Sequence, residues 1–240
     1  MKARPVQTCW PGEPAPLITW PLVVTQNPKE QDDDDFNIGI YRMQVTGPNT
    51  TLMRWLKHRG GAQAHAAQMA AQGAVSTEPL PAAVVIGADP ATILAAVAPV
   101  PDTMSEYQFA GLLSGERVSL VDCKTVPIKV PANAEMIIEG EILPGETDIE
   151  GPFGENFGYM SEPGNKPVAR ITAITHRRDA IYYGITSQMP PSESTVLQST
   201  ANAALTHKIL RYDLGEASVN DLHFDLTFGG QAAHGIVSMT

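Results

Sequence analysis

The chain between residues 118 and 186 is dominated by segments in which apolar residues recur at every second position. These segments are residues 118–123, 128–130, 134–143, 168–175 and 180–186. Alternation of this kind places two sets of side chains on the two faces of a β-strand, and short polar turns such as Arg177-Arg178-Asp179 join the segments. The pattern therefore predicts a mainly antiparallel barrel or curled sheet.

The remainder of the chain adds further strands and several helices. Predicted strands cover residues 17–20, 22–25, 36–46, 84–86, 222–228 and 236–239, and predicted helices cover residues 49–58, 63–72 and 194–210. Two more helices have clear start signals. Asp89-Pro90 supplies an N-cap and a proline at the first helical position, while Ser105 and Gln108 form a capping-box pattern for a helix that ends near Gly115.

Composition narrows the class of protein. At 240 residues the chain can bury a sizeable core, and its net charge of −10 argues against a nucleic-acid partner, because phosphate neutralisation needs a basic face. Its two cysteines, Cys9 and Cys123, lack metal-site spacing and predict reduced, inert packing residues of a cytoplasmic protein. The first residues predict no secretion signal, and no apolar run predicts a membrane-spanning helix.

The sequence Glu-Gly-Pro-Phe-Gly-Glu at residues 150–155 sets two carboxylates on either side of a tight turn. Its glycines and proline supply the backbone angles of a sharp reversal, so Glu150 and Glu155 can converge on one small volume. If an arginine lies beside one carboxylate, that one stays ionised, and the more desolvated partner keeps its proton and can act as an acid. A turn with two solvated glutamates is the alternative interpretation.

Basic residues in this acidic chain are candidates for binding an anion. Alternation within residues 36–46 places Arg42 on one face with Ile38 and Ile40, which fits either a buried functional arginine or an edge-strand arginine whose stem covers apolar surface. Four further basic residues gather at positions 54–59. They fit either a phosphate site or cations that complement the C-terminal dipole of the predicted helix.

Six motifs follow one another between residues 37 and 155. They are Asn37-Ile38-Gly39-Ile40-Tyr41-Arg42, Met53-Arg54-Trp55-Leu56-Lys57-His58-Arg59-Gly60-Gly61-Ala62, Gly87-Ala88-Asp89-Pro90, Pro101-Asp102-Thr103-Met104-Ser105-Glu106-Tyr107, Val130-Pro131-Ala132-Asn133-Ala134-Glu135 and Glu150-Gly151-Pro152-Phe153-Gly154-Glu155. With these motifs in this order, the chain resembles the UbiD family of aromatic-acid decarboxylases, most closely its 3-polyprenyl-4-hydroxybenzoate decarboxylases of ubiquinone synthesis.

The resemblance implies a role for each matching position. The family's catalytic Glu-Arg-Glu network falls on Glu150, Arg42 and Glu155, with Glu155 as the proton donor, and its metal ligands fall on Asn37 and Glu106. Its flavin contacts fall on Ile40, Tyr41, Arg42, Arg54, Trp55, Leu56, Arg59 and Gly60. Some relatives have a histidine as a third metal ligand near the position of Arg54, so water and phosphate are expected to complete the metal shell here.

The implied cofactor is prenylated FMN, which a partner flavin prenyltransferase makes and which Mn²⁺, together with K⁺, bridges to the protein. Loss of CO₂ from an aromatic ring leaves negative charge on an sp² carbon, and a cofactor must act as the electron sink. The protein must add a cation that orients the carboxylate, an ionised partner for that cation, and a neutral acid. Arg42, Glu150 and Glu155 match these roles in that order.

The resemblance also implies an α+β fold and two domains. Residues 1–188 are expected to form a split β-barrel of the FMN-binding type, with flanking helices and an N-terminal arm. Residues 189–240 are expected to form a linker helix and the beginning of an incomplete C-terminal α/β domain. Because family members are longer, the 240-residue chain is expected to bind flavin poorly and to be inactive by itself.

The leading functional hypothesis is non-oxidative decarboxylation of 3-polyprenyl-4-hydroxybenzoate by a cytoplasmic homo-oligomer. A prenylated substrate would also bring the protein to the inner face of the cell membrane as a peripheral protein. Two alternatives stay open. One is decarboxylation of a different, small aromatic acid, and the other is a non-catalytic flavin-binding or assembly role.

Overall fold

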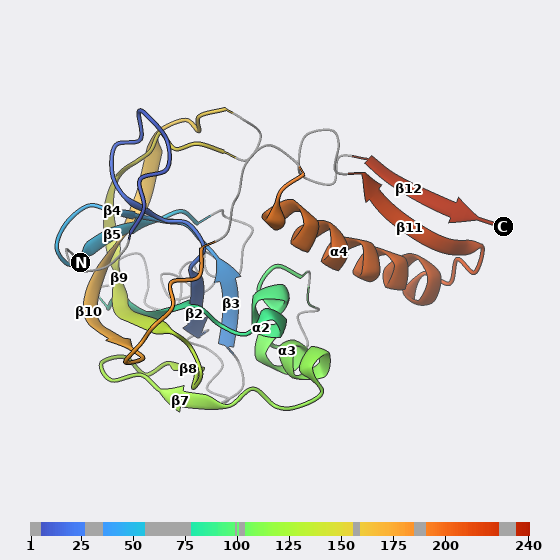
Figure 1. Cartoon of the computed structure of the whole chain (residues 1–240), viewed down its shortest axis with the longest axis horizontal. Coiled ribbons are helices and arrows are strands. Elements are labelled where there is room, and N and C mark those ends of the chain that lie inside the picture. The colour runs from blue at the N-terminus through green and yellow to red at the C-terminus, as the bar shows by residue number, and fades with distance from the viewer. Residues whose placement is uncertain are drawn as a thin grey trace.

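The computed structural model describes residues 6–26, 36–55, 78–98, 100, 104–155, 159–184, 191–225 and 234–240. The largest group of elements is one curled sheet with two helices beside it, and a smaller group of elements follows at the C-terminal end (Figure 1). The predicted α+β fold class is confirmed.

The main sheet has eight strands, and each pair of neighbours is antiparallel. In spatial order they are β1 (Leu17–Ile18), β4 (Met43–Val45), β5 (Thr50–Met53), β10 (Gly164–His176), β9 (Met136–Glu150), β6 (Leu80–Ile86), β2 (Leu22–Gln26) and β3 (Phe36–Ile40). The long β9–β10 hairpin forms the middle of the sheet, as the period-two pattern predicts. The predicted antiparallel curled sheet is therefore confirmed.

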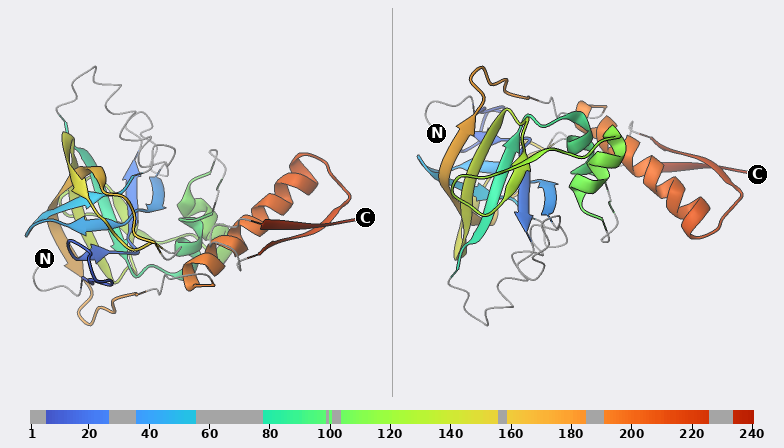
Figure 2. Two further views of the ribbon diagram at one scale, coloured as in Figure 1. Left: turned by 90° about the horizontal axis from the view of Figure 1, so that it is seen from above. Right: turned by 90° about the horizontal axis from the view of Figure 1, so that it is seen from below.

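The strands β3 and β4 follow each other in the sequence but lie toward opposite ends of this order, and this explains the curl. β3 is one edge strand, β4 lies next to the other edge strand, and only Tyr41 and Arg42 connect them. The step from Ile40 to Met43 covers three residues, which span at most about 11 Å when fully extended. The two ends of the sheet must therefore approach each other, and the sheet becomes an open barrel (Figures 1 and 2). Arg42 lies where the two ends of the sheet meet, which is the seam of the open barrel.

Two clusters of buried side chains share the strand β6. Leu80, Ala82, Val84 and Ile86 point into the cluster that also contains Ile18 of β1, whereas the alternate residues of β6 point into a second cluster. The second cluster includes residues of both helices that lie beside β2 and β3. Burial on both faces explains why β6 reads in the sequence as a continuous apolar run.

The helices α2 (Pro90–Ala95) and α3 (Glu106–Ser114) begin where the sequence predicts. Asp89 caps α2 by accepting a hydrogen bond from the Thr92 N–H at 3.0 Å. Ser105 and Gln108 form the capping box of α3, and Gly115 ends that helix at a φ of 78°. A small hairpin of β7 (Leu120–Asp122) and β8 (Lys129–Pro131) follows.

The C-terminal elements form a separate group that projects from the barrel (Figures 1 and 2). They are α4 (Glu193–Lys208), the π-helical turn η1 (Ile209–Asp213), and the antiparallel pair β11 (Val219–Asp225) and β12 (His234–Met239). These match the predicted helix and two predicted strands. Among the described residues, no helix has the length and apolar character needed to cross a membrane.

Three predicted elements differ from the structure. The predicted helix at 49–58 is wrong where it is described, because residues 50–53 form β5, in which β-branched Thr50 and Thr51 pair with β10. The predicted strand at 36–46 is interrupted at Tyr41 and Arg42, where the chain crosses between the ends of the sheet, whereas the predicted separation of residues 17–20 from 22–25 is confirmed. Residues 180–184 of the predicted strand at 180–186 are not strand, and the predicted helix at 63–72 lies outside the described residues.

Candidate active site

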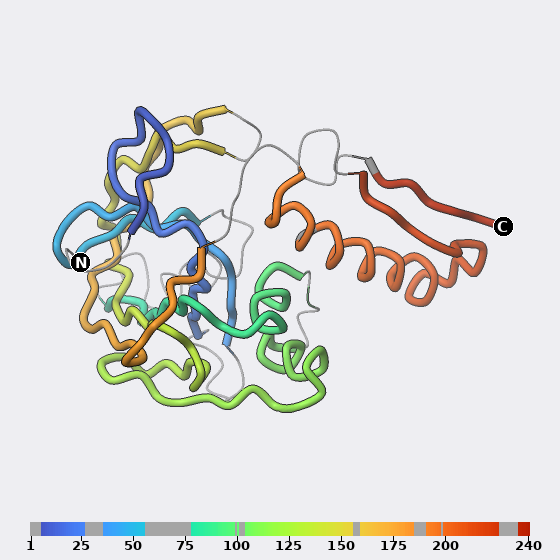
Figure 3. The backbone as a smooth tube through the Cα atoms, in the orientation of Figure 1, coloured from blue at the N-terminus to red at the C-terminus, as the bar shows by residue number. Residues whose placement is uncertain are grey.

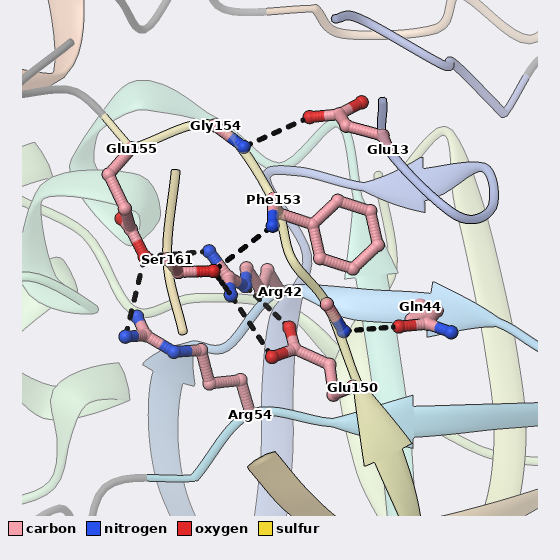
Figure 4. A network of polar contacts seen from close by, with 10 residues as sticks. Glu13, Arg42, Gln44, Arg54, Glu150, Phe153, Gly154, Glu155 and Ser161 are labelled. Carbon is pink, nitrogen blue, oxygen red and sulfur yellow. Dashed lines mark hydrogen bonds and ion pairs between the residues drawn. The ribbon is translucent and has the colours of Figure 1, made fainter. Parts of the chain in front are cut away.

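Arg42 binds both glutamates of the predicted turn (Figure 4). Its Nε and Nη2 atoms donate to the two carboxylate oxygens of Glu150 at 2.6 and 3.0 Å. Its Nη1 atom donates to Oε1 of Glu155 at 2.8 Å. The predicted convergence of Glu150 and Glu155 is confirmed, and one guanidinium joins the two carboxylates.

The turn is the connection between β9 and β10. Glu150 is the last residue of β9, and Gly151 has the positive φ of 85° that a glycine adopts without strain. Two backbone hydrogen bonds close the loop: the Glu155 N–H donates to the Tyr159 carbonyl at 2.8 Å, and the Ser161 N–H donates to the Phe153 carbonyl at 2.7 Å. Glu155 is therefore held on a folded loop rather than on a free one.

Burial and ion pairing coincide on the same carboxylate. The Glu150 side chain is 1 % exposed, against 22 % for Glu155 and 11 % for Arg42. Arg42 lies beside both carboxylates and not beside one alone, and its bidentate pair is with the more buried of the two. The asymmetry of the site is therefore one of geometry: Glu150 has both oxygens engaged by Arg42, and Glu155 has one.

A second arginine, which directly follows β5, reaches Glu155. The Nη2 atom of Arg54 lies 3.3 Å from Oε1 of Glu155, the same oxygen that accepts from Arg42. The Arg54 N–H also donates to the Arg42 carbonyl at 3.1 Å, which fixes the two arginines side by side. Arg54 therefore has one observed anionic partner, the Glu155 carboxylate, and this fits the interpretation of Arg54 as an anion-binding residue.

Three residues of this site were not singled out in the sequence. The Ser161 hydroxyl accepts from Arg42 Nη2 and from the Phe153 N–H, both at 3.1 Å. The Gln44 side chain accepts from the Gly151 N–H at 2.9 Å. Phe153, fully buried, lies with its ring centroid 5.2 Å from the Arg42 guanidinium carbon. Only Phe153, inside the 150–155 motif, carried a sequence signal.

The predicted flavin contacts fall into three groups. Tyr41 and Trp55 are buried in the core, where their rings pack edge to face with centroids 6.2 Å apart, so packing already explains their side chains. Ile40, Arg42 and Arg54 retain partial exposure. Leu56, Arg59 and Gly60 lie outside the described residues.

The predicted metal ligands lie on neighbouring elements. Glu106, at the start of α3, accepts a hydrogen bond through Oε2 from the Ile38 N–H at 3.1 Å, beside Asn37 on the edge strand β3. The side-chain nitrogen of Asn37 is buried without a hydrogen-bond partner among the described residues. An amide and a carboxylate are oxygen donors of the kind that Mn²⁺ or Mg²⁺ accepts. No three His, Cys, Asp or Glu side chains in the described part of the chain gather to hold a metal, so a bound ion would need further ligands.

The two cysteines differ from the inert packing pair that was expected. Cys9 is exposed, and Cys123 is partly buried beside the second core cluster; both are free thiols. Burial, with the charges of Glu139 and Asp122, raises the pKa of Cys123 to about 12. The expectation therefore fits Cys123 and is wrong for Cys9, which lies in a proline-rich segment without a covering element.

Comparison with known proteins gives the family. The family model described as "UbiD: 3-octaprenyl-4-hydroxybenzoate carboxy-lyase Rift-related domain" matches residues 1–190. This match spans the barrel, both glutamates and Arg42. The chain belongs to the UbiD family.

Solved structures agree with this assignment. An evolved dimeric form of the UbiD-class enzyme HmfF from Pelotomaculum thermopropionicum, in complex with prFMN, is 32 % identical with a TM-score of 0.85 over 98 % of this chain and 52 % of its own. Vanillic acid decarboxylase from Sedimentibacter hydroxybenzoicus is 27 % identical with a TM-score of 0.86 over 98 % of this chain and 48 % of its own. The chain thus spans about half the length of these two proteins.

Proposed function

We propose that this chain carries the catalytic residues of an aromatic-acid decarboxylase that uses prenylated FMN. The observation that supports the proposal most directly is the bridge that Arg42 makes between Glu150 and Glu155, in a chain of the UbiD family. The prFMN bound to HmfF and the name of the vanillic acid decarboxylase support the cofactor and the reaction class.

Arg42, Glu150 and Glu155 would each have a separate role in the reaction. Prenylated FMN, when bound, supplies the electron sink for the carbon that loses CO₂. Arg42 orients the substrate carboxylate, and Glu150 keeps the guanidinium in place through both of its oxygens. Glu155 donates its proton to the ring carbon after the C–C bond to CO₂ has broken, and a proton from solvent restores the acid.

The experiment that tests the proposal is Glu155→Gln in the cofactor-loaded protein. Glutamine keeps the size and an acceptor oxygen but has no acidic proton, so decarboxylation should fall by at least about 100-fold while cofactor absorbance is retained. Glu162→Gln is the matched control, because Glu162 is exposed and lies seven residues further along the same β9–β10 connection. Unchanged turnover in Glu155→Gln would remove this residue as the acid.

Two substrates are proposed in order. The first is 3-polyprenyl-4-hydroxybenzoate of ubiquinone synthesis, which the description of the matching family model supports. The second is a small aromatic acid, which the 27 % identity to vanillic acid decarboxylase supports. Assays of a short-prenyl 4-hydroxybenzoate beside vanillate, with the same enzyme batch, decide between them by kcat/KM.

We also propose a metal site, flavin contacts and an assembly state for this protein. Asn37 and Glu106 would hold Mn²⁺ with phosphate and water, and Ile40, Arg42 and Arg54 would line the flavin. A flavin prenyltransferase would supply the cofactor, and the protein would act as a homo-oligomer, as the dimeric form of HmfF suggests. We propose a domain boundary at 188/189, which the projecting group of α4, η1, β11 and β12 supports.

A further inference from the structure

The loop formed by residues 7–17, the arm loop, lies against the connection that carries Glu155 (Figure 3). Its base is closed on the edge of the sheet, where the Leu17 N–H donates to the Gln7 carbonyl at 2.8 Å and the Val45 N–H donates to the Pro16 carbonyl at 3.0 Å. Its tip carries Glu13 and Trp10. The arm loop is thus anchored at one end and touches the candidate site at the other.

Glu13 joins the two segments through both carboxylate oxygens. Oε1 accepts from the Gly154 N–H at 3.2 Å, across 141 residues of sequence (Figure 4). Oε2 accepts from the Cys9 and Trp10 N–H groups at 3.0 and 3.2 Å. Three backbone N–H groups donate to the two oxygens of this carboxylate. A glutamine side chain has one acceptor oxygen and cannot accept all three.

Trp10 contacts the same glycine from its side. A Cβ placed on Gly154 would lie 2.6 Å from Cδ1 and 2.9 Å from Nε1 of the Trp10 indole, so the ring lies directly against the backbone of Gly154. A side chain at position 154 would displace the indole. The second glycine of the 150–155 motif therefore has a packing reason that the turn itself does not supply.

The tip of the arm loop is a tight turn. The Glu13 N–H donates to the Trp10 carbonyl at 3.4 Å across Pro11 and Gly12, and Gly12 has a φ of 89°. Proline followed by a positive-φ glycine is typical of a type II turn. The turn sets Trp10 and Glu13 three residues apart, and both meet Gly154.

These contacts act on the peptide unit between Phe153 and Gly154, one residue before Glu155. Its carbonyl, from Phe153, accepts the Ser161 N–H, and its N–H, from Gly154, donates to Glu13. We propose that Glu13 and Trp10 are positioning residues for the proton-transfer step: they fix the peptide unit at both ends and so hold the Glu155 carboxyl at the angle that transfer requires. This inference rests on the proposed function of Glu155 as the acid.

The primary test compares Glu13→Ala and Glu13→Gln with the parent and with Glu146→Ala, whose side chain is exposed on β9. In the full-length, cofactor-loaded protein, Glu13→Ala should lower kcat about 10- to 100-fold with KM within about twofold, because misplacing an acid slows its transfer without removing substrate contacts. The solvent deuterium isotope effect on kcat should rise, since proton transfer becomes more rate-limiting. A loss of folded protein alone would leave that isotope effect unchanged.

A backbone variant tests the same idea without removing a polar group. Gly12→Ala strains the turn, and Gly145→Ala is its matched control, because Gly145 also has a positive φ and open space around its Cβ position. Gly12→Ala should reproduce the kcat and isotope-effect changes of Glu13→Ala, and Gly145→Ala should not.

Two readouts do not depend on activity. Hydrogen exchange of the Gly154 amide should speed up about five- to tenfold in Glu13→Ala, and quenching of Trp10 fluorescence by acrylamide should increase. The inference is overturned if Glu155→Gln is inactive while Glu13→Ala keeps the parental kcat and isotope effect, or if the Gly154 amide exchanges at the parental rate. If Glu155→Gln keeps full activity, the proposed function fails, and the positioning role falls with it.

Discussion

Arg42 and Glu150 form a bidentate ion pair in which both oxygens of a carboxylate that is 1 % exposed are bound by one guanidinium. The planar fork of arginine matches the carboxylate, and an ammonium group could not make both bonds in the same geometry. Because the Glu150 side chain is almost fully buried, Arg42 and not bulk solvent is the observed partner of its carboxylate. The pair therefore holds the seam of the barrel as well as the candidate site.

Removal of Arg42 should be costly for this reason. We expect Arg42→Ala to lower the free energy of unfolding by about 3–5 kcal/mol, because it leaves a buried carboxylate without its partner. The double variant Arg42→Ala/Glu150→Ala should recover part of that loss, since it also removes the uncompensated charge. Urea unfolding of the two single variants and the double variant measures the coupling, and additive losses would contradict it.

A second buried carboxylate, Glu139 of β9, predicts a pH dependence of stability. Burial opposes its ionised form, but hydrogen bonds from the Lys124 N–H, the Thr125 hydroxyl and the Thr125 N–H outweigh burial and lower the pKa of Glu139 below its ordinary value. A lowered pKa in the folded state means that the ionised form stabilises the fold above the ordinary pKa of about 4.5 and that this stabilisation is lost as the pH falls below it.

Glu139→Gln should therefore be less stable than the parent near neutral pH, by about 1–3 kcal/mol. The difference between the two proteins should shrink as the pH is lowered through the range below about 4.5. Glu141→Gln on the same strand is the control, because Glu141 is partly exposed. Thermal unfolding as a function of pH measures all three proteins, and a difference that stays constant with pH would contradict the assignment.

The two thiols should be distinguishable by reaction. Burial raises the pKa of Cys123 to about 12, so its thiolate is scarce near neutrality. Partial burial and the charge of Glu13 also raise the pKa of Cys9, but Cys9 is exposed. In the folded protein at about pH 8, a disulfide reagent should modify Cys9 first and Cys123 only after unfolding. Cys9→Ser should abolish the reaction of the folded protein, and a remaining fast thiol would contradict this.

Local signals in the sequence predicted the fold where they were sufficient. The caps at Asp89 and Ser105 and the alternation of the β9–β10 segments are decided by neighbouring residues, and the structure confirms them. Residues 50–53 were misjudged because long-range pairing decides them: β5 is a strand since β4 and β10 lie on either side of it. The break at residues 41–42 likewise follows from closing the sheet, which no local pattern shows.

Some residues of the candidate site could likewise be predicted from local sequence, and others could not. Glu150 and Glu155 share one turn and could be brought together from spacing alone, whereas their bridge to Arg42 spans 108 and 113 residues and rested on the family resemblance. Ser161, Gln44 and Glu13 had no sequence signal, because a serine, a glutamine or a glutamate in a polar loop is ordinary. Their contacts depend on which segments the curled sheet places side by side.

Glu106 has two candidate roles, which are to accept the Ile38 N–H at the edge of β3 and to hold a metal ion. Its carboxylate accepts the Ile38 N–H at 3.1 Å on the open side of an edge strand, and a glutamine could accept that bond equally well. A divalent ion needs the negative charge. If Glu106 holds the metal with Asn37, Glu106→Gln should keep the parental melting temperature but bind Mn²⁺ at least about tenfold more weakly, and Mn²⁺ should no longer strengthen FMN binding.

Glu116→Gln is the matched control for this experiment, because Glu116 is exposed just beyond the end of α3. Isothermal titration of Mn²⁺ into the three proteins, followed by FMN titration with and without the metal, gives both affinities. Parental Mn²⁺ binding in Glu106→Gln would show that the carboxylate does not hold the metal. Weakened binding with an unchanged melting temperature assigns it to the metal, since the edge-strand bond is the same in both proteins.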